Sequence, residues 1–261
     1  MPEKENNFED INQKSTKEFI ENISKFNPPV DNNIKYAIYC EELVKDYEIG
    51  DFIVRAVDNI SLSILNGEFL VIKGPSGAGK TSLLNLLGGL DSPNKGVIFN
   101  FGVKISDMDE ESLTTWRLLN SGFVFQNYNL ISTLTAEENV MFPMNLSGVD
   151  FKMQRERAKE LLRRMGLSER REHLPFQLSA GEQQRVAIAR ALANNPPMII
   201  ADEPTANLDK TTSKFIQELF TELKDKVRTI IIATHDDFLI SLADRVITFD
   251  DGKIIKEEIM N

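Results

Sequence analysis

The chain has 261 residues, which is within the size of one α/β domain and enough to bury a core without disulfides. Its 30 lysines and arginines against 40 aspartates and glutamates leave a net charge of −10, which argues against a nucleic-acid partner. One cysteine and two histidines exclude an intrachain disulfide and a Cys/His zinc site. Because no apolar run of about 18 residues and no N-terminal targeting signal is present, we expect a soluble, cytoplasmic protein.

Residues 1–33 differ in composition from the rest, because asparagine, glutamate and lysine dominate them and Asn27-Pro28-Pro29 closes the stretch. We interpret them as a polar, partly disordered extension, and residues 34–261 as one folded domain. Inside the extension, residues 16–26 combine capping-box spacing with an apolar stripe, which predicts one short amphipathic helix.

Strand patterns open the folded domain. They cover residues 37–44, 54–64 and 69–74, where apolar and β-branched residues are frequent. Asn66-Gly67 lies between the last two runs, and this dipeptide is a strong signal for a tight hairpin. We therefore expect an antiparallel β region in which residues 54–64 and 69–74 pair across that turn.

Strand and helix patterns alternate later in the chain. A glycine-rich loop precedes a helix-period apolar run at residues 81–90, and short apolar runs follow at residues 198–203 and 229–235. Such runs are typical of strands buried on both faces of a parallel sheet. A helix is expected over residues 210–226, and a terminal hairpin at Asp251-Gly252. This order predicts an α/β fold with a parallel sheet.

Helical patterns dominate between about residues 107 and 180. Residues 151–166, for example, place Leu161 and Leu162 on an inward face and end at Gly166, a typical helix stop. We therefore expect a helical subdomain inserted in the middle of the domain.

Residues 74–81 satisfy the pattern G-x-x-x-x-G-K-[ST] between a predicted strand and a predicted helix, as the motif requires. Its glycines let the backbone wrap around phosphates, its lysine bridges the β- and γ-phosphates, and its last hydroxyl can ligate Mg²⁺. The predicted fold is thus an α/β P-loop NTPase core. The nucleotide-binding residues expected from the motif and its helix start are Gly74, Pro75, Ser76, Gly77, Ala78, Gly79, Lys80, Thr81 and Ser82.

Two acidic residues follow the apolar run that begins at Met198. Asp202 and Glu203 would stand at the carboxyl end of a strand, where ligands bind in open α/β sheets. We predict that Asp202 joins Thr81 in holding Mg²⁺ and that Glu203 orients or deprotonates a water molecule. A solvated loop is the alternative for such a pair, and the phosphate loop upstream argues against it.

A second polar pair follows residues 229–233. His235 would reach the same sheet edge as the acids, and we predict that it contacts the γ-phosphate or orients water. A structural histidine paired with Asp236 is the alternative. Gln126 also ends a short apolar run, so its amide could reach the metal or the attacking water, although most single glutamines are only exposed. His173 is interpreted as structural or surface-exposed.

Residues 178–182, LSAGE, precede a helical pattern. Ser179 and Glu182 have the spacing of an ordinary capping box, which alone would explain both. A cap does not explain Gly181 in the first turn, where glycine is costly unless the backbone must approach an anion. A second phosphate-contacting helix start is therefore the sharper hypothesis.

Jointly, these motifs resemble the ATP-binding cassette of ABC transporters over about residues 36–255. The match runs through the Walker A loop at residues 74–81, the Q-loop at Gln126, the signature at residues 178–182, the Walker B strand at residues 198–203, the D-loop at Thr205 to Asp209 and the switch histidine at His235. The runs LLNLLGGLDSP, GFVFQNYNLISTLTAEENV and LSAGEQQRVAIARAL are similar to the lipoprotein-release, macrolide-export and FtsE-like branch of the family.

The resemblance implies an ATPase in which two cassettes close head to tail over two ATP molecules. The signature Ser179, Ala180, Gly181 and Glu182 of one chain would act on the ATP in the Walker A loop of the other, where the family usually has glycine at Ala180 and glutamine at Glu182. Hydrolysis would use Glu203, His235 and Gln126, with Mg²⁺ held by Thr81, Gln126 and Asp202. Tyr47 would stack on adenine.

The implied cofactors are ATP and Mg²⁺, and the implied partners are a second cassette, identical or related, and a transmembrane permease subunit. The protein would then sit peripherally on the cytoplasmic face of a membrane, powering that permease, with residues 34–261 as its ATPase domain. The alternatives are a soluble non-transport ATPase of the same family, acting in assembly or regulation, and a nucleotide-dependent clamp with little turnover.

Overall fold

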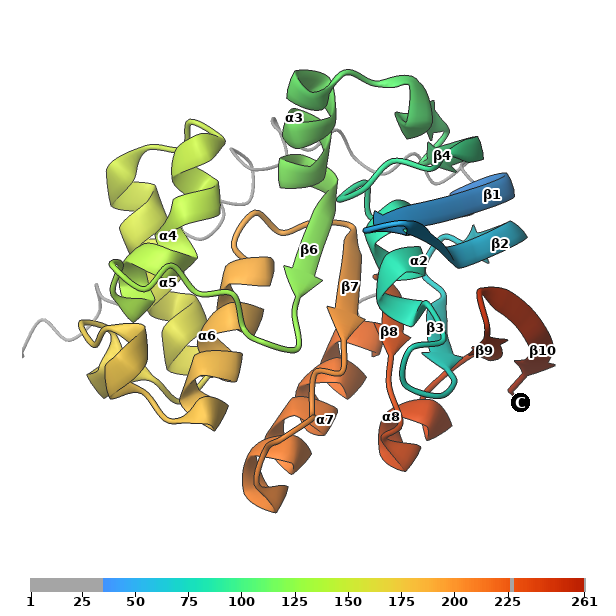
Figure 1. Cartoon of the computed structure of the whole chain (residues 1–261). Helices are drawn as coiled ribbons and strands as arrows, with labels where there is room; N and C mark the ends of the chain where they lie inside the picture. The colour runs from blue at the N-terminus through green and yellow to red at the C-terminus, as the bar shows by residue number, and fades with distance from the viewer. Residues whose placement is uncertain (1–34, 226–227, 261) are drawn as a thin grey trace, which may run out of the picture.

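The computed structural model describes residues 35–225 and 228–260 of the chain. The predicted extension, with its expected helix over residues 16–26, lies outside these residues. Two sheets organise the fold (Figure 1). The first has the strand order β2-β1-β4-β5, and the second has the order β10-β9-β3-β8-β7-β6.

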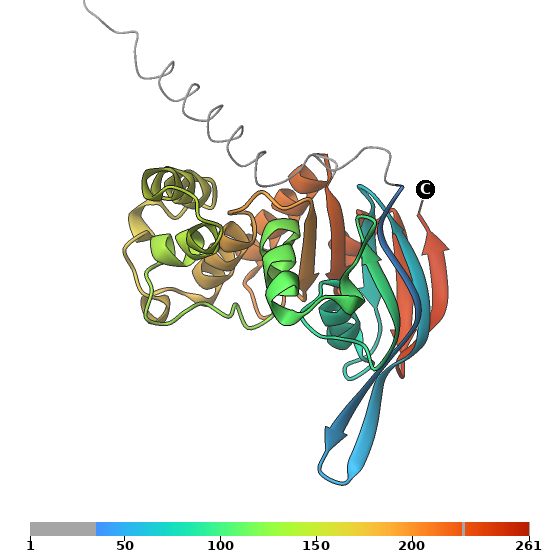
Figure 2. The same ribbon diagram turned by 90° about the horizontal axis from the view of Figure 1, so that it is seen from above.

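The first sheet is antiparallel throughout. Its strands are β1 (Tyr36–Ile49), β2 (Phe52–Leu65), β4 (Lys95–Asn100) and β5 (Val103–Lys104). The strands β1 and β2 form a long hairpin that extends well beyond the body of the protein (Figure 2). The expected antiparallel β region is therefore present, but its central hairpin turns at Gly50 and Asp51.

The second sheet holds the parallel core. Its strands are β3 (Phe69–Lys73), β6 (Ser121–Val124), β7 (Met198–Asp202), β8 (Thr229–Ala233), β9 (Arg245–Asp250) and β10 (Lys253–Ile259). All neighbours pair in parallel except β9 and β10, which form the predicted terminal hairpin. The α/β class with a parallel sheet is thereby confirmed.

The helices cover both faces of the second sheet. They are α2 (Lys80–Leu87), α3 (Glu110–Asn120), α4 (Ala136–Leu146), α5 (Phe151–Arg164), α6 (Ala180–Ala191), α7 (Lys210–Asp225) and α8 (Asp237–Ser241), with short 3₁₀ turns η1 (Ile105–Asp107), η2 (Ser168–Arg170) and η3 (Pro175–Gln177). Alternate residues of one strand face different cores, because Phe69 packs with the α4 to α8 side and Leu70 with α2 and the first sheet. This double burial explains why the parallel strands are continuous apolar runs.

The segment 107–180 is not helical throughout. β6 lies inside it and pairs with β7, so it joins the central sheet, and α3 adds Leu113 and Trp116 to the hydrophobic core that also contains α2. The separate helical lobe is formed by α4, α5 and α6 (Figure 1). The bounds of the domain and of its helical part remain predictions.

The prediction of a hairpin at Asn66-Gly67 is wrong. A turn is present there, but β2 pairs with β1 whereas β3 pairs with β8 and β9, so the turn passes the chain from one sheet to the other. Glu68 is only 7% exposed and stabilises this turn. Its carboxylate accepts hydrogen bonds from the backbone N–H of Leu65 and, at 2.6 Å, from the Arg245 guanidinium. A buried ion pair thus fixes a turn whose dipeptide alone favours a hairpin.

We expect Glu68→Ala to lower the free energy of unfolding by about 3 kcal/mol, because it leaves the half-buried Arg245 without its bidentate partner. Glu257→Ala is the matched control, since Glu257 pairs with the same guanidinium at 2.7 Å but is largely exposed, and it should cost under about 1 kcal/mol. Urea denaturation of both variants measures the difference. Equal losses would contradict the role given to Glu68.

Candidate active site

Three groups of the predicted functional residues gather at one edge of the second sheet. Because β3, β6, β7 and β8 are parallel, their carboxyl ends share that edge, where ligands bind in open α/β folds. The glycine-rich loop follows β3, Asp202 ends β7, and His235 follows β8 by two residues. Three segments far apart in sequence therefore bring their polar groups together.

The glycine-rich loop encloses the side chain of Lys80. Its Nζ atom donates hydrogen bonds to the carbonyl oxygens of Gly74 at 2.6 Å and Pro75 at 2.9 Å, and the residue is 8% exposed. Gly79 precedes α2 with a positive φ of 100° and provides no side-chain cap. The first N–H groups of α2 are therefore available to an anion, next to a fixed positive charge.

Thr81 and Asp202 meet across the two segments. The Thr81 hydroxyl donates to the Asp202 carboxylate at 2.6 Å, although 121 residues separate them in the chain. Oxygen ligands of this kind suit Mg²⁺, which typically takes one or two protein groups and completes its shell with waters and substrate phosphates. Within the described ranges, no three Asp, Glu, His or Cys side chains are grouped so that they could hold a metal ion among them.

Glu203 is held in a strained and sheltered position. Its φ is +47°, rare for a residue other than glycine, and its N–H donates to the Ala233 carbonyl at 2.8 Å. Burial raises the pKa of its carboxyl, against the opposing effects of His235 and Lys80. A carboxylate with a raised pKa is a stronger base, as proton abstraction from water requires.

His235 faces Glu203 and does not pair with Asp236. Its Nε2 lies 3.5 Å from Glu203 Oε1, and its side chain is 59% exposed, so the ring is open to a ligand. Asp236 instead accepts hydrogen bonds from Thr205 and Gln217 and caps α8. The alternative of a structural His235–Asp236 pair is therefore unsupported by the contacts.

The signature residues begin α6, in the helical lobe. Ser179 and Glu182 form the predicted capping box, with Ser179 N–H to Glu182 Oε2 at 2.8 Å. Ser179 and Ala180 are exposed, and Ala180 is already the first residue of the helix, where its methyl group is tolerated. Gly181 has a second reason to be glycine, because a Cβ there would lie 2.7 Å from the Thr212 hydroxyl.

Tyr47 lies close to α2. Its hydroxyl donates to Asp91 at 2.9 Å and lies near the Ser82 hydroxyl, and Lys45 Nζ lies 5.1 Å from its ring centre. Burial and the Asp91 carboxylate raise the pKa of this phenol. The ring is thus fixed beside the start of the helix that follows the phosphate loop.

We expect Tyr47→Leu to weaken ATP binding roughly tenfold, because an aromatic face that stacks on a base is worth about 1 kcal/mol or more. Tyr47→Phe keeps the ring and loses only the bond to Asp91, so its ATP affinity should stay within about twofold of wild type. Calorimetric titration measures both. Similar losses in the two variants would show that the hydroxyl, and not the ring, matters.

Two predicted residues are not drawn into the cluster. Gln126 is exposed two residues beyond β6, and in the described chain its side chain makes no hydrogen bond to Asp202 or Thr81. His173 is partly exposed in the loop before η3, where its backbone carbonyl accepts the Ala136 N–H. Gln126 stays a candidate because its strand neighbours β7.

The structure adds residues that the motifs did not reveal. The Asp91 carboxylate accepts hydrogen bonds from both Tyr47 and Lys45. Thr212 packs on Gly181, and its hydroxyl donates to Asp209 at 2.7 Å. The Gln184 amide of α6 donates to the Pro204 carbonyl at 2.8 Å, directly after Glu203. These contacts connect the signature helix to the segment behind Glu203. Asp91 lies shortly after the helix that follows the phosphate loop, but nothing in its spacing marks it.

Comparison with known proteins decides the family. Residues 57–206, more than half of the chain, match the family described as ABC transporter. The chain belongs to this family. It is 47% identical over 224 residues to the ABC transporter ATP-binding protein MJ1508 of Methanocaldococcus jannaschii, covering 86% of this chain and 99% of that protein.

Two further relatives extend the comparison. The macrolide export ATP-binding/permease protein MacB of Hyphomonas neptunium is 46% identical over 84% of this chain, which spans only 34% of MacB. The solved dimeric structure of the ATP-binding cassette MJ0796 bound to ADP and Pi superposes with a TM-score of 0.82 at 41% identity, covering 86% of this chain and 99% of that one.

These matches confirm the predicted family, the branch that includes macrolide exporters, the α/β fold and the ATPase class. An ABC cassette of this family binds ATP and serves as an ATP-binding subunit of a transporter. In the described part of the chain, no helix has the length and apolar character needed to cross a bilayer.

Proposed function

We propose that this ABC protein is the ATP-hydrolysing subunit of a transporter and that it powers a separate membrane permease through nucleotide-driven dimerisation. The observation that supports the proposal is that two pairs of side chains meet at the same edge of the second sheet. Thr81 meets Asp202, and Glu203 meets His235, beside the loop that encloses Lys80.

The roles of the residues follow from this arrangement. Residues 74–82 hold the ATP phosphates through backbone N–H groups and Lys80. Thr81 and Asp202, with Gln126 as a further ligand, would hold a Mg²⁺ ion, which supplies positive charge against the phosphates. Glu203 takes the proton of the attacking water, and His235 holds that carboxylate in place while its exposed ring reaches the γ-phosphate.

The signature residues act on a second copy or on a related cassette. Ser179 and Ala180 are exposed at the start of α6, which lies in the helical lobe, whereas the phosphate loop lies beside α2 on the other side of the sheet (Figure 1). One chain therefore does not bring the two together. The solved structure of the MJ0796 cassette with ADP and Pi is dimeric, which supports a dimer here as well. We infer a head-to-tail arrangement of that dimer, because it would bring Ser179 of one chain to the phosphate loop of the other.

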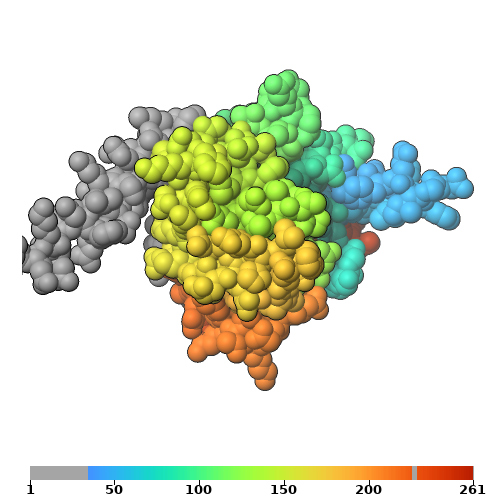
Figure 3. Space-filling view, turned by 90° about the vertical axis from the view of Figure 1, so that its left-hand side faces the viewer, coloured from blue at the N-terminus to red at the C-terminus, as the bar shows by residue number. Residues whose placement is uncertain are grey.

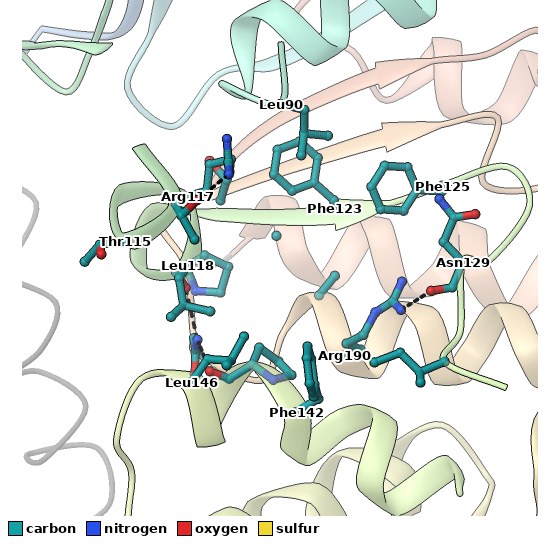
Figure 4. A pocket seen from close by; sticks show the side chains of 18 residues that line it. Leu90, Thr115, Arg117, Leu118, Phe123, Phe125, Asn129, Phe142, Leu146 and Arg190 are labelled. Atoms are coloured by element: carbon teal, nitrogen blue, oxygen red, sulfur yellow. Dashed lines mark hydrogen bonds between the residues drawn. The ribbon is translucent and has the colours of Figure 1, made fainter. Parts of the chain in front are cut away.

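A groove suits a permease segment. A pocket of about 560 Å³ lies between β6 and α3 on one side and α4 and α6 on the other (Figure 4). The rings of Phe123 and Phe125 are stacked in it, and Phe142 and Leu146 of α4 are exposed there. We infer that a cytoplasmic segment of the permease docks on these apolar groups, next to Gln126, which would place the protein peripherally on the cytoplasmic face of a membrane.

Capture from the native cell tests the proposal. The Glu203→Gln variant, tagged and loaded with ATP and Mg²⁺, should retain a polytopic membrane protein in stoichiometric amount from detergent-solubilised membranes, as mass spectrometry will show. Leu146→Glu in the same background should lose that protein while keeping ATP-dependent dimers, because it places a charge in the groove. Recovery of soluble partners alone would favour the assembly or regulatory ATPase instead.

A further inference from the structure

Phe52 and Phe176 are the two most exposed phenylalanines in the described chain, at 76% and 77%. Scattered apolar residues are common on surfaces, but whole aromatic rings left in water are a mark of interfaces. The two residues lie in different parts of the fold, one in the β1–β2 hairpin and one in η3. Each borders a different half of the proposed composite ATP site.

Phe52 belongs to an apolar face of the hairpin that begins at Tyr47. Across the ladder Tyr47 is opposite Val54 and Ile49 is opposite Phe52, so all four side chains point to the same side. Ile49 is 62% exposed and Val54 is 46% exposed. The hairpin end projects from the body (Figures 2 and 3), and Tyr47 beside Ser82 turns this face toward the phosphate loop.

Phe176 stands next to the signature. It is the middle residue of η3 and precedes Ser179, the N-cap of α6, by three residues, so the two lie within about 10 Å of each other. In the hairpin, Phe52 lies two ladder positions beyond Val54, which is about 7 Å along the strand. Both rings are therefore close to the groups that meet across the ATP site.

We propose that Phe52 of each copy packs against Phe176 of the second copy when two chains close over ATP, forming an aromatic contact at each end of the dimer. The proposal rests on the head-to-tail dimer of the proposed function. That dimer brings Ser179 of one chain over residues 74–81 of the other, and so brings η3 toward the hairpin beside the same nucleotide.

A second copy fits these surfaces better than the nucleotide alone. The adenine base would cover Tyr47 and the neighbouring Val54, which leaves Ile49 and Phe52 in water at the outer end of the same face. A twofold axis relates the two copies, so one kind of contact forms twice and covers both phenylalanines of both chains. An identical partner supplies both rings from this chain alone.

Dimerisation of the full chain tests the contact. In the Glu203→Gln background with ATP, Phe52→Ser and Phe176→Ser should each raise the dimer dissociation constant by about tenfold to a hundredfold, measured by sedimentation, since two aromatic pairs are lost. The double variant should be little weaker than either single one, because both remove the same contact. Phe151→Ser is the matched control, since Phe151 is 64% exposed at the start of α5 and belongs to neither surface.

Cross-linking gives a second measurement. Cys40, the only cysteine, is 1% exposed and burial raises its pKa to about 12, so it does not react. A mixture of a Phe52→Cys chain and a Phe176→Cys chain, both carrying Glu203→Gln, should form a mixed dimer with a short bifunctional maleimide only when ATP is present. A mixture of the Phe52→Cys and Phe151→Cys chains should not.

The possible outcomes test the contact between Phe52 and Phe176 separately from dimerisation itself. An ATP-dependent dimer without the 52–176 cross-link, and with Phe52→Ser behaving like Phe151→Ser, overturns the contact and leaves the proposed function standing. If Glu203→Gln forms no dimer with ATP, the head-to-tail dimer is contradicted, and the contact between Phe52 and Phe176 is contradicted with it. Weaker ATP binding by isolated Phe52→Ser chains would assign Phe52 to the base instead of to the second copy.

Discussion

Replacing Glu203 by glutamine is expected to lower kcat for ATP hydrolysis by about 10²- to 10⁴-fold while ATP binding stays within about twofold. Glutamine has nearly the same shape but no basic oxygen. Burial has already raised the pKa of the Glu203 carboxyl, so the carboxylate is placed to accept a proton. The variant also removes a half-buried charge, so its fold should be at least as stable as wild type. Phosphate release and calorimetric titration measure rate and affinity.

The control is another carboxylate at the same sheet edge. Asp237 is exposed at the start of α8, two residues after His235, and takes no part in the cluster. Asp237→Asn should therefore hydrolyse ATP at about the wild-type rate. If Glu203→Gln retained more than about a tenth of the wild-type kcat, the proton acceptor would have to be another group, and His235 would be the next to test.

The motifs predicted which segments the fold brings together, because they encode local backbone and strand ends. The loop at residues 74–81, the strand ending in Asp202 and the strand before His235 each carry a short-range signal, and parallel pairing then brings them together. The Thr81–Asp202 contact follows from that order alone. The specific roles of these residues remain predictions.

The passing of the chain from the first sheet to the second after β2 could not be predicted from local sequence. Asn66-Gly67 favours a hairpin, yet Glu68 accepts from Arg245, which is 177 residues later in the chain, and this pair stabilises the turn from which β3 enters the other sheet. The β1–β2 hairpin was missed for a different, local reason. Gly50-Asp51 interrupts an apolar run without the usual order of turn residues, and the predicted strands stopped short of it.

The position of Gly181 shows a second limit of what can be predicted from the sequence. Its place in the first turn of α6 suggested an approach to an anion, and the structure shows that it also packs on Thr212. Both demands exclude a side chain, so sequence alone cannot separate them. The bond from Gln184 to Pro204 likewise depends on tertiary packing, and it joins the signature helix to the Glu203 segment by a path that no spacing reveals.

Replacing Gly79 by alanine is expected to lower the free energy of unfolding by about 4 kcal/mol and to weaken ATP binding at least about a hundredfold. Its φ of +100° is unfavourable for alanine, and an added Cβ would lie 2.0 Å from the Ala56 carbonyl oxygen of β2, which is backbone and cannot turn away. Backbone strain costs about 1–3 kcal/mol, and overpacking adds a similar amount. The loop can relieve the overlap only by moving the N–H groups that face the phosphates.

A substitution at Gly77 shows the effect of backbone strain without the close contact with β2. It also has a positive φ, of 79°, but an added Cβ would meet nothing within 4 Å. Gly77→Ala therefore adds the strain of a left-handed backbone, about 1 to 2 kcal/mol, without an overlap with the rest of the protein, so its losses of stability and ATP affinity should be smaller than those of Gly79→Ala. Denaturation and nucleotide titration of the pair compare the two effects directly. Equal losses would mean that φ alone governs the loop, whereas a larger loss at Gly79 shows that contact with β2 holds the phosphate loop in place.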